Sequence, residues 1–145
     1  MKTRGFEVLS QYKELQIEKP SRSTEKAAGY DIRSITSGVI VPGEAMVFDT
    51  GLTAYMKADE FLALFIRSGM AFKHDLVLQN ATGIIDADYY GKHIKIKIRN
   101  EGNENYEIKA GDRIAQGIFL PYLLTDDDND HEKQEREDGF GHTGK

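Results

Sequence analysis

The stretch Gly-Ile-Ile-Asp-Ala-Asp-Tyr-Tyr-Gly at residues 83–91, together with the run that follows it, decides the fold class of this chain. In residues 92–99 isoleucine alternates with charged or polar residues, the pattern of a strand with one buried face. Asp86 and Tyr89 are three positions apart, so on an extended strand their side chains would point to opposite faces. They converge only if the chain turns between them, and the flanking glycines permit such a turn.

This pairing of residue types has a chemical meaning. A carboxylate that can hold a water, beside a ring that can pack on a flat or puckered ligand, suits hydrolysis of a small molecule. An isolated Asp-x-x-Tyr is more often an Asp-capped turn with a core tyrosine, because aspartate is common in turns. The rest of the chain must therefore decide between the two interpretations.

The bulk properties narrow the class of protein. The chain has 145 residues, enough for one domain with a core, and its 39% hydrophobic and 30% charged residues fit a soluble globular protein. It has no apolar run near the roughly 20 residues of a membrane helix, and no apolar segment after the basic N-terminus that would indicate a signal peptide. The absence of cysteine excludes disulfides and is compatible with a cytoplasmic location. A net charge of -5 disfavours nucleic acid as the main partner.

Strand patterns dominate the remaining sequence, and turn signals recur at short spacing. Residues 68–74 alone are expected to form a helical turn or two, and residues 100–105 a hairpin-type connection. Short strands between frequent turns favour an all-β sandwich, jelly roll or barrel. The further strands are predicted at residues 39–41, 45–55, 60–67 and 112–120.

The C-terminal region differs from the rest. Residues 126–130 hold four of the 24 acidic residues, and they lack the spacing of a calcium loop, so they indicate a solvated linker. The last segment carries Phe140 between glycines. It is either a frayed end or a mobile arm that orders over a ligand, with Phe140 stacking and Arg136 and backbone amides meeting anions.

Five separated segments, one of which contains residues 83–91, together carry a resemblance to a known family. In their set and order the chain resembles the trimeric dUTPase family, over about residues 27–144. The resemblance implies an all-β, distorted jelly-roll or β-barrel subunit, the dUTPase-like β-clip, with a mobile C-terminal arm. It also implies a homotrimer whose active sites are each shared between chains. The segments are Ala28-Gly29-Tyr30-Asp31-Ile32, Arg67-Ser68-Gly69-Met70-Ala71, residues 80–91, Gly111-Asp112-Arg113-Ile114-Ala115-Gln116 and residues 136–144.

The resemblance also implies a reaction and a division of the chain. The reaction is hydrolysis of dUTP to dUMP and pyrophosphate by attack of water on the α-phosphorus, with Mg²⁺ on the triphosphate. Such an enzyme limits uracil in DNA and supplies dUMP for dTTP synthesis. The expected parts are a β domain at residues 1–124, an acidic linker at 125–135 and a glycine-rich arm at 136–145 that closes over an active site.

Three residues match the family positions nearest the nucleoside. Asp86 matches the carboxylate that orients and activates the attacking water. Tyr89 matches the ring under the deoxyribose, which leaves no room for a 2′-hydroxyl and so separates dUTP from UTP. Asn80 matches the residue beside the base, where its amide presents both a donor and an acceptor to uracil. Further matched substrate contacts are Gly83, Ile85, Arg136, Phe140 and Gly141.

Other residues match the family's phosphate side. Ser68 and Gly69 offer a hydroxyl and free amides at the start of a short helix. Arg67 adds charge or is simply a surface cation at a strand end, and Gln116 offers an amide or is a strand-end polar residue. Asp31 resembles the residue that holds the magnesium's water shell or anchors a phosphate-side arginine. Magnesium would be held largely through the substrate and waters, because it dehydrates reluctantly.

Three alternatives compete with the assignment to dUTP hydrolysis. A dCTP deaminase shares the fold but needs a glutamate ten residues after the matched aspartate, where this chain has Ile96. A binding protein that uses the same scaffold for a regulatory protein partner is a second alternative, since fold does not fix function, but the intact catalytic set argues against a purely non-enzymatic role. A ligand-binding β-sandwich without a nucleotide role leaves the five segments unexplained. One departure from the family pattern is that Glu137 and Asp138 stand where glycines are often found.

Overall fold

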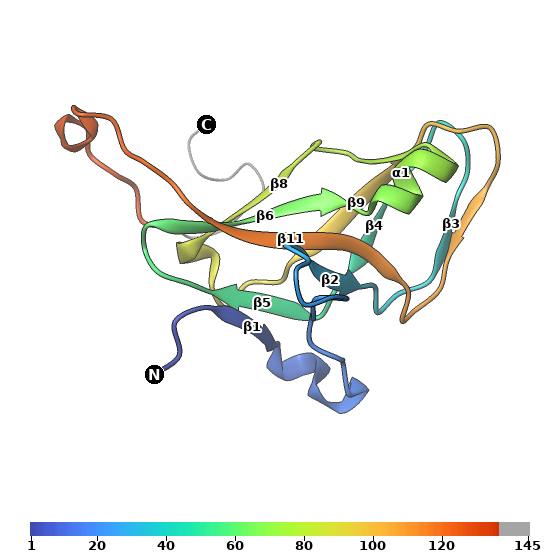
Figure 1. Cartoon of the computed structure of the whole chain (residues 1–145), viewed down its shortest axis with the longest axis horizontal. Coiled ribbons are helices and arrows are strands. Elements are labelled where there is room, and N and C mark those ends of the chain that lie inside the picture. Colours follow the sequence, from blue (N-terminus) through green and yellow to red (C-terminus); the bar gives the residue numbers. More distant parts are fainter. Residues whose placement is uncertain (137–145) are drawn as a thin grey trace.

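The protein, in a computed structural model that describes residues 1–136, is built mainly of antiparallel strands. Its strands form four small sheets, in the orders β1-β5, β10-β3, β2-β11-β6-β8 and β4-β9-β7. Figure 1 shows them wrapped into one elongated body, from which the chain after β11 extends at one end. The strands are β1 (Gly5–Val8), β2 (Tyr30–Arg33), β3 (Gly38–Ile40), β4 (Ala45–Asp49), β5 (Leu52–Tyr55), β6 (Glu60–Ile66), β7 (Leu76–Leu78), β8 (Gly83–Asp86), β9 (Lys95–Asn100), β10 (Tyr106–Ile108) and β11 (Arg113–Pro121).

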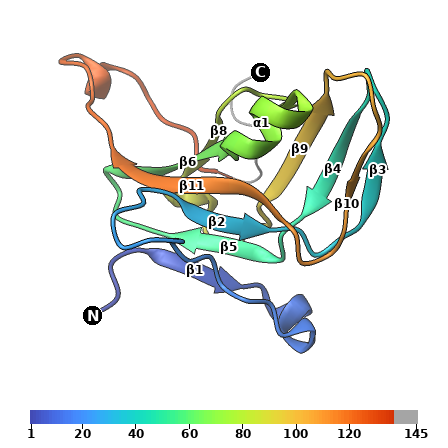
Figure 2. The same cartoon turned by 45° about the vertical axis from the view of Figure 1, so that its right-hand side comes forward.

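Helical structure is short and lies between strands. The predicted helical segment is confirmed as α1 (Ser68–His74), which packs against β7. Three 3-10 turns, η1 (Ser10–Leu15), η2 (Ala87–Tyr89) and η3 (Asp128–Asp130), complete the described elements. Among residues 1–136 no helix is long and apolar enough to cross a membrane. Figure 2 shows α1 above the strands and η1 below β1, on opposite sides of the body.

The four-stranded sheet is arranged around β6. After Glu60 its residues are all apolar, which fits a strand that is paired on both edges, with β11 on one side and β8 on the other. Leu62 and Leu64 of β6 are buried in the core. The β8 strand approaches β6 closely at Gly83, where a Cβ atom would lie 2.9 Å from the Cβ of Leu64. Glycine is therefore required at that position for the two strands to pair.

The alternating run after residue 91 is confirmed as a strand, with a later start. Ile94, Ile96 and Ile98 are buried, while Lys95 and Lys97 are exposed, as a strand with one buried face requires. The ladder of β9 begins at Lys95 instead of residue 92. The reason is that the residues before it are bonded to the start of β5, with the Ile94 amide donating to the Leu52 carbonyl at 2.9 Å.

Two sequence predictions are corrected by the topology. The apolar run at residues 45–55 is not one strand but β4 and β5, which are divided by a turn in which Gly51 has a φ of 72°. Residues 100–105 are not a hairpin, because β9 and β10 belong to different sheets. Asn100 explains the second case: its buried amide donates to the carbonyls of Ile40 and Glu104, at 2.8 Å each, and so directs the chain toward β3.

The core lies between the sheets and is filled by residues from nearly every strand. Isoleucine and leucine supply most of it, and its C-terminal member is Ala115. The described chain beyond β11 therefore adds little to the core. Five strands were not predicted, because each is only three or four residues long and carries too short an apolar pattern to be recognised: β1, β2, β7, β8 and β10.

Candidate active site

The predicted turn between Asp86 and Tyr89 is present. Asp86 ends β8, and the single 3-10 turn η2 brings the chain around so that the two residues no longer follow an extended path. Gly91 closes the turn with a φ of 88°, a conformation that favours glycine. The Asp86 side chain is 50% exposed, so a water or ligand can reach it, whereas Tyr89 is only 6% exposed.

Arg136 joins Asp86 and Tyr89 into one cluster. Its Nη2 donates to Asp86 Oδ2, and its Nε donates to Asp88 Oδ1 at 2.6 Å. Its guanidinium carbon also lies 5.8 Å from the centre of the Tyr89 ring, within the range of a cation–π contact. Only 10% of the Arg136 side chain is exposed. The C-terminal segment thus returns to the turn, although the two are 50 positions apart in sequence.

A pocket of about 540 Å³ opens beside this turn. Five of the residues predicted to contact substrate or water line it, namely Asn80, Gly83, Ile85, Asp86 and Arg136. Lys95, Ile96 and Lys97 form another part of the wall, so the position where a deaminase needs a carboxylate is apolar here. The volume and the mixture of apolar and polar walls suit a nucleoside-sized ligand.

The backbone at the Asn80 end of the pocket is tightly turned. The Thr82 amide donates to the Asn80 carbonyl at 2.6 Å, which closes a three-residue turn. Ala81, in the middle of that turn, has a φ of 63°, which is unusual for a residue other than glycine. Backbone held in a sparsely populated conformation is typical of ligand sites, where surrounding structure fixes it.

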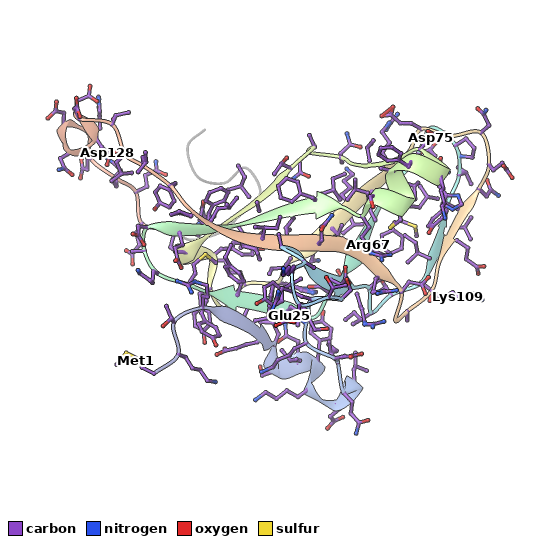
Figure 3. The ribbon with its side chains drawn as sticks, viewed as in Figure 1. Met1, Glu25, Arg67, Asp75, Lys109 and Asp128 are labelled. Carbon is purple, nitrogen blue, oxygen red and sulfur yellow. The ribbon has the colours of Figure 1, made fainter. Side chains whose placement is uncertain are left out.

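A second cluster gathers the predicted phosphate-side residues. Asp31 on β2 lies between two arginines, with Arg67 Nε 3.5 Å from one carboxylate oxygen and Arg113 Nη1 3.5 Å from the other. Gln116 faces Asp31 across the β2–β11 ladder, and its Nε2 donates to the Ile66 carbonyl at 3.4 Å. Arg67 precedes α1, whose first residues are Ser68 and Gly69. In Figure 3 Arg67 lies in the middle part of the molecule, far from Asp128 at its end.

The start of α1 is open to approach. Ser68 and Gly69 are both exposed, and a Cβ atom built on Gly69 would meet no atom within 4 Å apart from its chain neighbours and the helix's own backbone. No side chain caps the helix. Its first amides are therefore available as donors to an anion.

The two clusters lie at opposite ends of β6. Asp86 is paired with Phe61 near the beginning of that strand, and Arg67 directly follows its last residue, Ile66. Six residues of extended chain separate the two points, which corresponds to about 20 Å. The two clusters of one chain therefore lie well apart along β6.

Four charged residues of these clusters were not predicted as site residues: Asp88, Lys95, Lys97 and Arg113. Arg113 could have been found from its place in the quoted segment at residues 111–116, because its charge is opposite to that of Asp31. Asp88 and the two lysines carry no such signal, since charged residues on turns and strand surfaces are common. Phe140 and Gly141 lie outside the described residues.

Comparisons with known proteins give a single answer. The dUTPase family model matches residues 16–144. The deoxyuridine 5′-triphosphate nucleotidohydrolase of Lactococcus lactis is 46% identical over 149 aligned positions, which cover 99% of each chain. The corresponding enzyme of Haemophilus influenzae is 44% identical and covers 87% of each chain.

Solved structures agree with these sequence relatives. The dUTPase of Streptococcus mutans superposes with a TM-score of 0.77 and 38% identity, covering 84% of this chain and 98% of that one. A mutant dUTPase of phage phi11 of S. aureus, which shows the coordination of a structural Mg(II) ion, has a TM-score of 0.74 and 25% identity over 95% and 100% of the chains. The Staphylococcus bacteriophage 80alpha dUTPase with dUPNHPP, described in a study of phage dUTPases that control transfer of virulence genes, has a TM-score of 0.74 and 28% identity over 99% of each chain.

Proposed function

This chain belongs to the dUTPase family and is a dUTP nucleotidohydrolase, and from that premise we propose which of its residues carry out the hydrolysis. The activity rests on the family match over residues 16–144 and on relatives that cover nearly the whole chain. The products are dUMP and pyrophosphate. Removal of dUTP limits uracil in DNA and provides dUMP for dTTP synthesis. A cytoplasmic location suits this role, because free nucleotides are found there.

Asp86 positions and activates the attacking water. Its carboxylate is half exposed at the edge of the pocket, where a water can be held against a ligand. The triphosphate is negative and repels hydroxide, so orientation of a neutral water and acceptance of its proton are the tasks left to the protein. Arg136 now neutralises Asp86 and Asp88, and in the complex its guanidinium would turn to the phosphates.

Asn80, Gly83, Ile85 and Tyr89 recognise the nucleoside. The first three line the same pocket, and Gly83 lets the ligand approach the backbone. The Asn80 amide offers uracil a donor and an acceptor, and cytosine would leave buried polar groups unpaired at a cost of about 1–3 kcal/mol each. Tyr89 packs under the deoxyribose and excludes a 2′-hydroxyl.

Arg67, Ser68, Gly69 and Gln116 bind the phosphates. The open amides at the start of α1 suit an anion. Asp31 holds Arg67 from β2, and its position between two arginines supports the anchoring role over direct support of a metal ion.

The distance between the two clusters is the observation that supports an assembly of several chains. Because Asp86 and Arg67 of one chain are about 20 Å apart along β6, a complete site needs the phosphate-side cluster of a second chain. Closed rings of identical chains meet this need with one kind of interface. A homotrimer with active sites shared between chains satisfies it, and the arm at residues 136–145, with Phe140 and Gly141, would close each site.

Magnesium enters as part of the substrate. Among residues 1–136 no group of three acidic or histidine side chains could hold a metal ion, and Asp31 is already paired with two arginines. The donor set therefore fits a Mg²⁺ ion that is carried on the triphosphate and keeps most of its waters. The bound ion would neutralise phosphate charge, while the residues above orient the water and hold the nucleotide.

The experiment that tests this proposal is pyrophosphate release from dUTP, dCTP, dTTP and UTP in parallel, with and without Mg²⁺. We expect Mg²⁺-dependent release from dUTP alone. Release from dCTP or UTP at a comparable rate would refute the assigned roles of Asn80 or Tyr89. No release from any substrate by a folded oligomer would favour a scaffold that binds a regulatory protein. The acidic residues 126–130, most of which are exposed, are the candidate contact.

A further inference from the structure

The segment after the catalytic turn is fastened to β5 by an unusual set of polar groups. The residues of the described chain that are both buried and polar are four: Ser34, Thr50, Thr53 and Asn100. Ser34 donates to the Thr36 carbonyl, and Asn100 donates to the carbonyls of Ile40 and Glu104, so neither is bonded to the segment after Asp86. Thr50 and Thr53 flank the start of β5, with 0% and 2% exposure.

Both threonines bond to residues 91–94. Thr50 Oγ1 donates to the Ile94 carbonyl at 2.6 Å, and the Gly91 amide donates to Thr53 Oγ1 at 2.8 Å. A buried hydroxyl needs a partner, and a valine would fill the same space without that requirement. Valine at either position would leave the Ile94 carbonyl or the Gly91 amide without this partner, so the two hydroxyls hold the segment that follows Asp86.

His93 adds a third tie to the same region. Its Nε2 accepts a hydrogen bond from the Gly51 amide at 2.9 Å, and its ring lies 5.1 Å from that of Tyr12 in η1. Its own carbonyl accepts the hydroxyl of Tyr89 at 2.6 Å. The ring of His93 thus fixes the backbone that holds the hydroxyl of Tyr89.

We propose that His93 and Thr53 are positioning residues for Tyr89: they hold residues 91–93 on β5 and thereby fix the ring that contacts the sugar. The proposal rests on the role of Tyr89 given above. Without these ties the ring gains room to move away from the 2′ position, and UTP is then rejected less strongly. Neither residue lines the pocket. Their link to the site is the hydrogen bond from the Tyr89 hydroxyl to the His93 carbonyl, and the Tyr89 ring in turn lies against Arg136, which does line the pocket.

The tie through His93 depends on pH. Only the neutral ring can accept the Gly51 hydrogen bond at Nε2, and both nitrogens become donors on protonation. Burial lowers the pKa of His93 below its ordinary value of 6.5; Asp49 at the end of β4 opposes this shift and Lys95 of β9 adds to it. Because the folded pKa is depressed, the tie is complete above the ordinary pKa and is lost as the pH falls through the lower, folded value.

The test compares the ratio of kcat/KM for dUTP to that for UTP in wild type, His93→Phe, His93→Gln and Thr53→Val. Phenylalanine keeps a ring but has no acceptor, glutamine keeps an acceptor that does not titrate, and valine removes only the hydroxyl. We expect His93→Phe and Thr53→Val to lower the ratio about three- to tenfold, the effect of one hydrogen bond, and His93→Gln to retain it.

The pH dependence gives a second readout. The ratio cancels titration of Asp86 and of the triphosphate, because both substrates share them. From about pH 8 to about pH 5 the wild-type ratio should fall, while that of His93→Gln should stay constant. A ratio that is unchanged in His93→Phe, or an equal pH dependence in wild type and His93→Gln, would overturn the proposal.

Amide hydrogen exchange separates this proposal from the assigned role of Tyr89. His93→Phe should expose the Gly51 amide to exchange, and Thr53→Val the Gly91 amide, in enzyme without substrate. If Tyr89→Ala does not change the selectivity ratio, the role of Tyr89 fails. If Tyr89→Ala lowers the ratio while His93→Phe alters neither the ratio nor the exchange of Gly51, the positioning role fails. Should His93→Phe not fold, Thr53→Val and the pH profile of His93→Gln decide the question.

Discussion

The two ends of β6 present different chemical groups, and the proposed mechanism assigns them different parts of one reaction. At the Phe61 end, Asp86 stands on a turn with a half-exposed carboxylate beside a pocket. At the Ile66 end, Arg67 and Arg113 surround Asp31 next to the open start of α1. The first end suits a water and a nucleoside, and the second suits phosphates.

Neither end is a complete site. A strand of seven residues holds them apart rigidly, since β6 is paired on both edges. The proposed mechanism therefore requires a second chain to bring together the groups that meet at the α-phosphorus. The predictions below test this separation, beginning with the largest expected effect.

Replacement of Asp86 by asparagine should remove the water-activating end alone. An amide cannot accept the water's proton, so we expect kcat to fall about 10²- to 10⁴-fold, the usual contribution of a general base. Binding of a non-hydrolysable dUTP analogue, measured by calorimetry, should stay near that of wild type. Near-normal turnover would refute Asp86 as the base.

Deletion of residues 136–145 should also disable the Asp86 end while it leaves the other end intact. We expect kcat/KM to fall about 10²-fold, because Arg136 and the closing arm are lost together. The buried core ends at Ala115, so the truncated chain should remain folded and oligomeric by sedimentation. Unfolded or dissociated chains would show instead that this segment is structural.

Mixed oligomers test directly whether the two ends act across chains. Asp86→Asn and Arg67→Ala variants should each be nearly inactive alone. Co-expressed, they should form oligomers in which about a quarter of the sites receive Asp86 from one chain and Arg67 from another. Pyrophosphate release should recover accordingly. As a control, Asp86→Asn co-expressed with the double variant should stay inactive; a mixture of the single variants that also stays inactive would contradict the shared site.

Replacement of Asp31 by asparagine should have the smallest effect. The Arg67 and Arg113 pairs are partly exposed and 3.5 Å long, and such pairs contribute little, so we expect KM to rise no more than about fivefold at nearly constant kcat. Steady-state kinetics at several Mg²⁺ concentrations would measure this. A collapse of kcat that excess Mg²⁺ reverses would indicate that Asp31 supports the metal instead of an arginine.

The pattern of local sequence predicted much of this fold. The alternation of isoleucines identified β9, because a period of two is visible without any partner strand. The Ser68–His74 helix was found from its flanking residues. The strand pairing could not be found in this way, as the error at residues 100–105 shows: the direction of that loop depends on the contacts of buried Asn100 with Ile40, 60 positions away.

By itself, the sequence determined the family, the reaction and the chemical groups available, because these depend on which residue types occur at which spacing. Only the tertiary structure decided which groups meet. In it, Arg136 contacts Asp86, Asp31 lies between two arginines, and the His93 ring accepts a hydrogen bond from the Gly51 amide. These contacts join residues from separate elements, and their geometry follows from strand pairing and core packing, for which short segments of sequence carry no local signal.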